Sequence, residues 1–146
     1  MNRRGADIIY LAARLILGAV FVYASVDKII HPQAFAQIVH NFRILPDFMV
    51  NPAALIMPFM ELTAGAALII GRPAFPAALI LTGFVVVFAV AVGFNLARGL
   101  DFQCGCFTTS PEARSANITT FIRDILLLIP AVLALQGAAR RVSGIV

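Results

Sequence analysis

Four long apolar stretches dominate the sequence and restrict the folds that the chain can adopt. They cover residues 7–30, 53–70, 75–97 and 118–136, and each is close to the roughly 20 residues that a helix needs to cross a bilayer. Apolar residues make up 61% of the chain and charged residues only 12%, too few charges for a soluble surface. So apolar a chain is not disordered either. We therefore predict an all-α, four-helix membrane bundle, with residues 1–146 forming a single transmembrane domain.

The distribution of basic residues predicts how the bundle faces the membrane. An even number of spans places both termini on one side. That side carries five arginines, Arg3, Arg4, Arg72, Arg140 and Arg141. The opposite side also has five basic residues, but Lys28 and Arg123 fall inside the predicted spans. Because cytoplasmic loops carry the excess of Lys and Arg, we expect cytoplasmic termini and both long connections on the outer side of the membrane.

The first long connection contains a helical pattern of its own. Phe35, Ile38, Val39 and Phe42 recur at helical spacing, with polar residues between them. This pattern predicts a short amphipathic helix in the interface or over the mouth of the bundle. Of these two positions we favour passive contact with lipid. A second apolar group, residues 48–50, follows in the same connection.

Two ionisable residues fall deep inside the predicted spans. Arg14 and Glu61 each lie about 10–14 Å from the cytoplasmic end of their helix at 1.5 Å per residue. Charged groups at such depth face the interior and have partners, so these two are expected to pair. The pair is either a structural ion pair that fixes helix register or a proton-relay or ligand-polarising pair.

Four more charged residues form two adjacent pairs near the outer ends of the spans. Asp27 and Lys28 end the first span, and Arg123 and Asp124 begin the fourth. They are either interfacial anchors with snorkelling side chains or a polar cluster beneath the outer connections, close to the cysteines. The residues alone leave both interpretations open.

The two cysteines of the chain form the most informative motif. Cys104 and Cys106 flank one glycine in the second outer connection. A bridge between cysteines two apart is strained, which makes it easy to reduce and suits exchange, and an oxidising compartment agrees with such a role. The alternative is a metal site with His31 and His40, but these histidines lack paired ligand spacing. We therefore predict a redox pair and no metal site.

The position of the cysteines restricts the route of electrons. Both lie on one side of the membrane, and no span contains another cysteine. The chain alone therefore cannot pass reducing equivalents across the membrane by a thiol relay. It exchanges disulfides on one side, transfers electrons to a carrier such as a quinone, or works with another subunit. No haem-attachment, nucleotide or dinucleotide motif is present, and we expect no nucleic-acid partner.

Three segments in this order resemble the DoxX-like superfamily and, within it, the MauE family of methylamine utilisation. They are residues 14–32 (RLILGAVFVYASVDKIIHP), 51–62 (NPAALIMPFMEL) and 101–107 (DFQCGCF). The resemblance runs from about Arg14 to about Leu135. A glycine often follows the phenylalanine of the third motif, whereas Thr108 stands there in this chain, which puts the geometry of that loop in doubt.

The resemblance implies a four-helix protein of the bacterial inner membrane that helps to mature a disulfide-rich periplasmic dehydrogenase beside a thioredoxin-like partner. Other clients are equally compatible with the motifs. Cys104 and Cys106 would be the redox pair. Four residues would match the polar positions of the family, without a defined role: Arg14, Asp27, Lys28 and Glu61.

Together, these features predict a membrane-embedded thiol–disulfide oxidoreductase. Cys104 and Cys106 would exchange disulfides with a thioredoxin-like partner or a disulfide-containing client outside the membrane. The first alternative is a quinone-coupled dithiol oxidoreductase with a pocket near Arg14 or Glu61, lined by aromatics such as Phe21, Phe59 or Phe84. The second is a non-enzymatic anchor for a soluble oxidoreductase. A transporter is a weaker option, because four spans would need a homo-oligomer to form a path.

Overall fold

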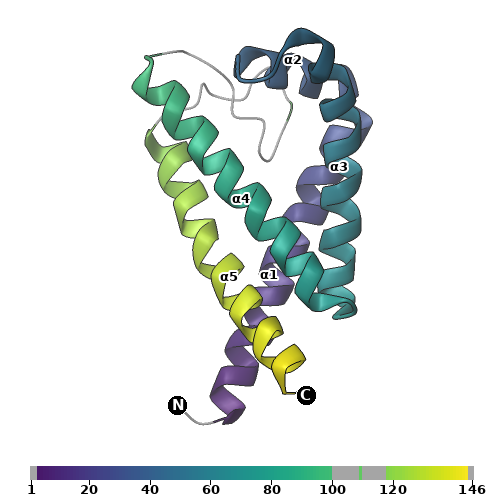
Figure 1. The fold of residues 1–146 in the computed structure, drawn as a ribbon, viewed down its shortest axis with the longest axis vertical. Coiled ribbons are helices and arrows are strands. Elements are labelled where there is room, and N and C mark those ends of the chain that lie inside the picture. The colour runs from purple at the N-terminus through teal and green to yellow at the C-terminus, as the bar shows by residue number, and fades with distance from the viewer. Residues whose placement is uncertain (1–2, 100–108, 110–117, 145–146) are drawn as a thin grey trace.

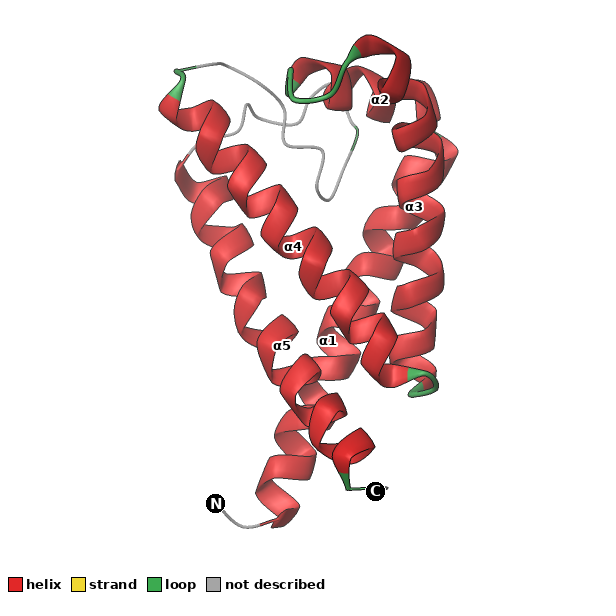
Figure 2. Ribbon diagram, in the orientation of Figure 1, coloured by secondary structure: helices red, strands yellow, loops and turns green. Residues whose placement is uncertain are grey.

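The fold consists of five helices in a computed structural model that describes residues 3–99, 109 and 118–144. The helices are α1 (Arg3–Ile30), α2 (Pro32–Asn41), α3 (Asp47–Ile70), α4 (Ala74–Ala97) and α5 (Ile118–Ser143). The described residues contain no strand, as Figure 2 shows. Four helices, all except α2, are long and apolar enough to cross a membrane. The predicted all-α, four-helix membrane bundle is therefore confirmed.

The four long helices form a ring in the order α1, α3, α4, α5. Each contacts its two neighbours, and α1 and α4 barely touch across the ring. The axis of the bundle is filled by fully buried residues from all four helices, namely Leu17, Leu68, Leu81 and Ala131. Both termini lie at one end, which we call the terminal end, and α2 lies at the opposite α2 end (Figure 1). This agrees with an even number of spans.

At the terminal end, α1 and α5 extend past the turn that joins α3 to α4 (Figure 1). We expected the first span to begin at residue 7, but α1 begins at Arg3. We expected the fourth span to end at residue 136, but α5 runs to Ser143. The two extensions pack on each other. The side chain of Arg141 donates to Asp7 at 2.7 Å and covers the ring of Tyr10. These contacts stabilise helical turns that are too polar to be read as membrane spans.

Helix α3 begins six residues earlier than expected, at Asp47 rather than Ala53. Pro46 precedes the helix and Asp47 occupies its first turn, where a carboxylate interacts favourably with the helix dipole. The apolar residues 48–50 therefore belong to the start of α3 and not to a separate loop segment. Pro52 lies inside the helix. Because proline has no N–H, the carbonyl of Phe48 lacks its helical donor. Phe48 is an exposed residue.

The predicted amphipathic helix is α2, but its position differs from our expectation. Helix α1 ends at Ile30 because Pro32 disfavours helical backbone at His31, and Pro32 then opens α2. Phe35 and Ile38 are 1% and 3% exposed and are buried against the bundle. The expectation of passive contact with lipid was therefore wrong. Helix α2 covers the end of the bundle because its apolar stripe packs against protein.

Helices α1 and α3 approach each other closely where they cross at Gly18 and Gly65. A Cβ atom built on Gly18 would lie 2.9 Å from the carbonyl oxygen of Gly65, and one on Gly65 would lie 3.1 Å from that of Gly18. Only glycine allows backbones to approach so closely, as in other membrane helix pairs. This contact fixes the antiparallel register of α1 and α3, which decides the position of every polar residue below.

Candidate functional site

Lys28 and Glu61 form a buried ion pair inside the bundle. The ammonium of Lys28 donates to both carboxylate oxygens of Glu61, at 3.0 and 2.8 Å. The two side chains are 1% and 0% exposed. Glu61 is about 20 Å along α3 from Asp47 at 1.5 Å per residue. A pair this deep costs a large desolvation penalty, which is offset only when both partners are in place.

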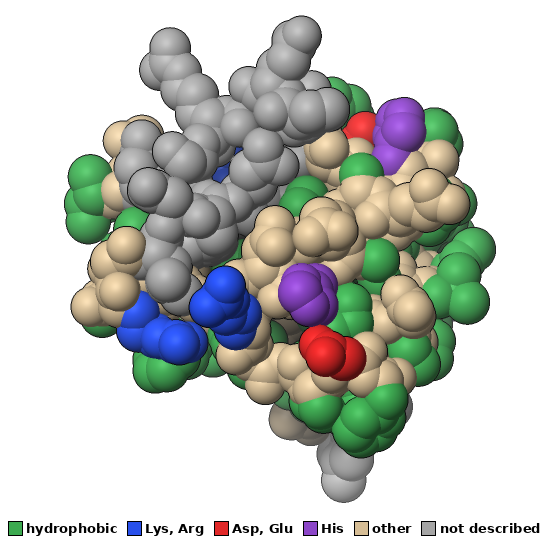
Figure 3. All heavy atoms as spheres, turned by 90° about the horizontal axis from the view of Figure 1, so that it is seen from above, with side chains coloured by type: hydrophobic (Ala, Val, Ile, Leu, Met, Phe, Trp, Pro, Cys, Tyr) green, Lys and Arg blue, Asp and Glu red, His purple; other side chains and the backbone are tan. Residues whose placement is uncertain are grey.

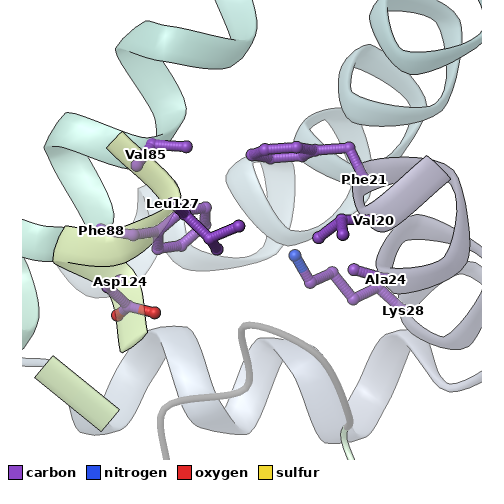
Figure 4. Close-up of a pocket in the computed structure, with 8 residues that line it drawn as sticks. All are labelled: Val20, Phe21, Ala24, Lys28, Val85, Phe88, Asp124 and Leu127. Carbon is purple, nitrogen blue, oxygen red and sulfur yellow. The ribbon is translucent and has the colours of Figure 1, made fainter. Parts of the chain in front are cut away.

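Groups from every other helix surround the ammonium of Lys28. The rings of Phe35 in α2 and Phe88 in α4 lie 5.1 and 5.2 Å from it, within the range of cation–π attraction. Lys28 and Asp124 of α5 line the same small cavity. Figure 4 shows the ammonium pointing into this cavity from one side, with the Asp124 carboxylate on the other side. All five helices therefore contribute to one site.

The expected pairing of Arg14 with Glu61 was wrong. Arg14 lies at the terminal end, where its guanidinium donates to the carbonyl of Ile69 at 3.4 Å. That carbonyl belongs to the last turn of α3, which ends at Gly71 in the left-handed conformation and has free acceptors. The reason is the register of the Gly18–Gly65 crossing, which places Arg14 beside the end of α3 and Glu61 beside the last turns of α1. Arg14 therefore has a structural role at a helix C-terminus.

The adjacent charged pairs Asp27–Lys28 and Arg123–Asp124 were interpreted either as interfacial anchors or as a polar cluster. The structure gives different answers for different members of these pairs. Lys28 and Asp124 are 1% and 3% exposed, so neither is a snorkelling anchor. Arg123 contacts Asp124 at 3.5 Å and its side chain is 45% exposed, as expected of a residue at the rim. Lys28, Glu61 and Asp124 therefore form a buried polar cluster inside the bundle, and Arg123 lies at its edge.

Asp27 connects this cluster to the second long connection. The backbone N–H and the hydroxyl of Thr109 both donate to one carboxylate oxygen of Asp27, at 2.6 and 2.9 Å. Thr109 is 4% exposed. Cys104 and Cys106 lie outside the described residues, and Thr109 is the third residue after Cys106. Two Cα atoms three residues apart are separated by at most about 11 Å in any chain, so this bond anchors the connection close to the cysteine motif.

The two histidines lie apart at the α2 end. His31 contacts the carboxylate of Asp27 and His40 that of Asp47, each at 3.4 Å, and Figure 3 shows them at separate places on this face, each beside an acidic side chain. Within the described ranges, no group of three His, Cys, Asp or Glu side chains is arranged to hold a metal ion. Each histidine therefore has an acidic neighbour of its own.

An apolar groove of about 350 Å³ runs between α2, α3 and α4. Its walls include Phe35, Phe42, Met57, Val87 and Phe88. This is not the aromatic pocket that we expected. Phe21 faces the small cavity beside Lys28, Phe59 is 50% exposed on the outer surface, and Phe84 stacks on Phe88.

Sequence reasoning missed Thr109, Phe35 and Phe88 as parts of the site. No local pattern marks Thr109, because its partner is 82 residues away. A signal for Lys28 was available, since it is the only lysine in a chain with ten arginines. Arginine supplies the other ten Lys and Arg positions, so the lysine at this position stands out.

In sequence, the chain resembles the proteins of one known family. The model of the family "Methylamine utilisation protein MauE" matches residues 6–137. A MauE protein of Paracoccus denitrificans is 37% identical over 97 residues, which cover 66% of this chain and 52% of that relative. One of Paracoccus versutus is 34% identical over 133 residues, covering 85% of this chain and 72% of the relative. No solved structure matches the chain.

The family model covers almost all of the four long helices. The chain spans about half the length of the first of these relatives and nearly three quarters of the second. The matched region includes α2, the Lys28–Glu61 pair and the cysteine motif. The chain therefore belongs to the MauE family.

Proposed function

We propose that this protein is an inner-membrane thiol–disulfide oxidoreductase of methylamine utilisation, with Cys104 and Cys106 as its redox pair. The termini face the cytoplasm, and the α2 end faces the periplasm. There the pair exchanges disulfides with a thioredoxin-like partner or with a disulfide-containing client. The family name supports the pathway, and the glycine-spaced cysteines support the chemistry.

The exchange needs no other redox group. One cysteine thiolate attacks a disulfide sulfur of the partner, a mixed disulfide forms, and the second cysteine displaces the partner thiolate. Two electrons and two protons pass from the dithiol of this chain to the disulfide of the partner. The reverse reaction uses the same atoms.

The hydrogen bonds from Thr109 to Asp27 carry the structural part of the proposal. A disulfide catalyst gains by holding its cysteine loop in a defined position. Both Thr109 donors converge on one carboxylate oxygen, and hydrogen bonds to carboxylates contribute about 1.5–3 kcal/mol each. Asp27 directly precedes Lys28 in α1, so this anchor attaches the cysteine connection to the buried polar cluster.

Replacing both cysteines by serine tests the function. In a host that depends on methylamine, the C104S/C106S variant should abolish disulfide formation in the client, measured by alkylation of its free thiols. Membrane insertion and abundance of the variant are the control. Full client oxidation with normal abundance of the variant would contradict the redox role and leave a non-enzymatic anchor. Labelling of reduced Cys104 and Cys106 in intact cells with an impermeant maleimide tests the orientation.

An Asp27→Asn variant examines the anchor separately. Loss of the charged acceptor should raise the rate at which a maleimide labels the reduced cysteines by at least about tenfold, because 1.4 kcal/mol is a factor of ten. Asp47→Asn is the matched control, since Asp47 is an exposed aspartate at the same end. Equal labelling rates in the two variants would show that Asp27 does not position the cysteine connection.

The apolar groove favours a second candidate function, electron transfer from the dithiol to a quinone. Its volume is in the range of small-molecule sites, and its Phe35 and Phe88 also contact the Lys28 ammonium. An isoprenoid quinone bound there would have its tail in the groove and its ring near the polar cluster.

An Ala53→Phe substitution, which fills part of the groove, tests this second function. If the function is present, purified protein should reduce a short-chain ubiquinone with a dithiol as donor, and the variant should lose about tenfold in this rate. Leu79→Phe on the exposed face of α4 is the control. Absence of any protein-dependent quinone reduction would exclude this candidate.

A further inference from the structure

The small cavity beside Lys28 is the strongest unassigned feature of the described structure. It measures about 20 Å³ and is lined on one side by Lys28 and Ala24 and on the other by Asp124 and Leu127. One water molecule needs about 10–15 Å³ of such volume and two or more polar partners. The ammonium and the carboxylate supply those partners from opposite walls, as Figure 4 shows.

The hydrogen bonds of Lys28 leave one donor for this cavity. An ammonium has three N–H donors, and the structure records two hydrogen bonds from Lys28, both to Glu61. The ammonium also lies against the Phe35 and Phe88 rings and beside the cavity. A buried N–H without an oxygen acceptor is costly, and a water in the cavity satisfies it.

The identity of the basic residue adds a second argument. Lys28 is the only lysine among eleven basic residues. Arginine is the better residue for a static buried ion pair, since its planar fork matches a carboxylate and it stays protonated. Lysine differs because it can release a proton when it is buried. A lysine at this position therefore allows a proton release that an arginine would not.

We propose that the cavity holds one water molecule and that Lys28 exchanges a proton with Asp124 through it. In the step, an N–H bond of the ammonium breaks and an O–H bond forms on the Asp124 carboxylate. The water accepts one proton and donates another, and no electrons move. The charged pair becomes a neutral amine and a neutral carboxylic acid, so the total charge of the site is unchanged.

In the described part of the chain, three charged side chains adjoin this step. Glu61 in α3 holds the ammonium, Asp27 in α1 is its sequence neighbour, and Arg123 in α5 contacts Asp124. Helices α2 and α4 contribute the apolar rings of Phe35 and Phe88. The proposal does not depend on the proposed function, because every measurement below is independent of thiol chemistry.

A single-lysine chain allows a direct test. In full-length protein labelled with 15N-lysine and placed in lipid nanodiscs, one Nζ signal is expected, with magnetisation transfer from a bound water. Ala24→Val fills the cavity and should abolish that transfer. Ala134→Val makes the same change at a buried residue that does not line the cavity and should preserve it. Retention of the water contact in Ala24→Val would overturn the water site.

Asp124→Asn tests the proton step and does not rely on the folding of the valine variants. It removes the proton acceptor and keeps the shape of the side chain. Exchange of the Nζ protons with solvent should slow by about 100-fold, the lower range for loss of a positioned general base. An unchanged exchange rate in Asp124→Asn would overturn the role of Asp124 as proton acceptor.

Discussion

Replacing Lys28 by methionine should lower the free energy of unfolding by about 3–5 kcal/mol, the cost of leaving one member of a buried pair without its partner. Glu61 would remain buried, at 0% exposure, and would lose both hydrogen bonds from the ammonium. The measurement is reversible unfolding of the purified protein in mixed micelles, followed by circular dichroism.

The double variant K28M/E61M separates two causes of this loss. If the loss comes from an isolated buried carboxylate, removing that carboxylate as well should restore most of the stability, because apolar replacement of a whole buried pair is often neutral. If K28M/E61M is as unstable as K28M, the loss comes from the packing of the lysine stem instead. Asp7→Asn breaks the exposed pair with Arg141 and should cost no more than about 1 kcal/mol.

The helices were predictable from the sequence because apolar length is a local property. The α4 span was expected at residues 75–97 and observed at Ala74–Ala97. The ends that were missed, at Arg3, Asp47 and Ser143, are those where polar turns are stabilised by packing or by a capping turn. Such contacts join residues far apart in sequence, for example Asp7 with Arg141.

The composition of the site was partly predictable, but its pairing was not. Lys28, Glu61, Asp27 and Asp124 were all singled out as charged residues inside or at the ends of spans. Their partners depend on helix register, and register depends on the contact between two glycines. We estimated the depth of each residue from the end of its own predicted span, which ignores how the helices are aligned. That estimate therefore paired Glu61 with Arg14, whereas its partner is Lys28.

The same register makes Gly65 sensitive to substitution. Gly65→Val should destabilise the protein by about 1–3 kcal/mol or more, the usual cost of overpacking. A Cβ atom there would lie 3.1 Å from the carbonyl oxygen of Gly18 and 3.3 Å from the backbone nitrogen of Val22. These are backbone atoms, so only separation of α1 and α3 relieves the contact. Unfolding in mixed micelles measures the loss.

Gly83→Val is the matched control, because a Cβ atom on Gly83 of α4 meets nothing within 4 Å. It should leave stability nearly unchanged. Separation of α1 from α3 should also pull Lys28 away from Glu61, since one lies on each helix. The single Nζ signal of 15N-lysine should therefore shift in Gly65→Val and stay in place in Gly83→Val. Loss of stability without that shift would mean that the glycine crossing supports the bundle but does not position the ion pair.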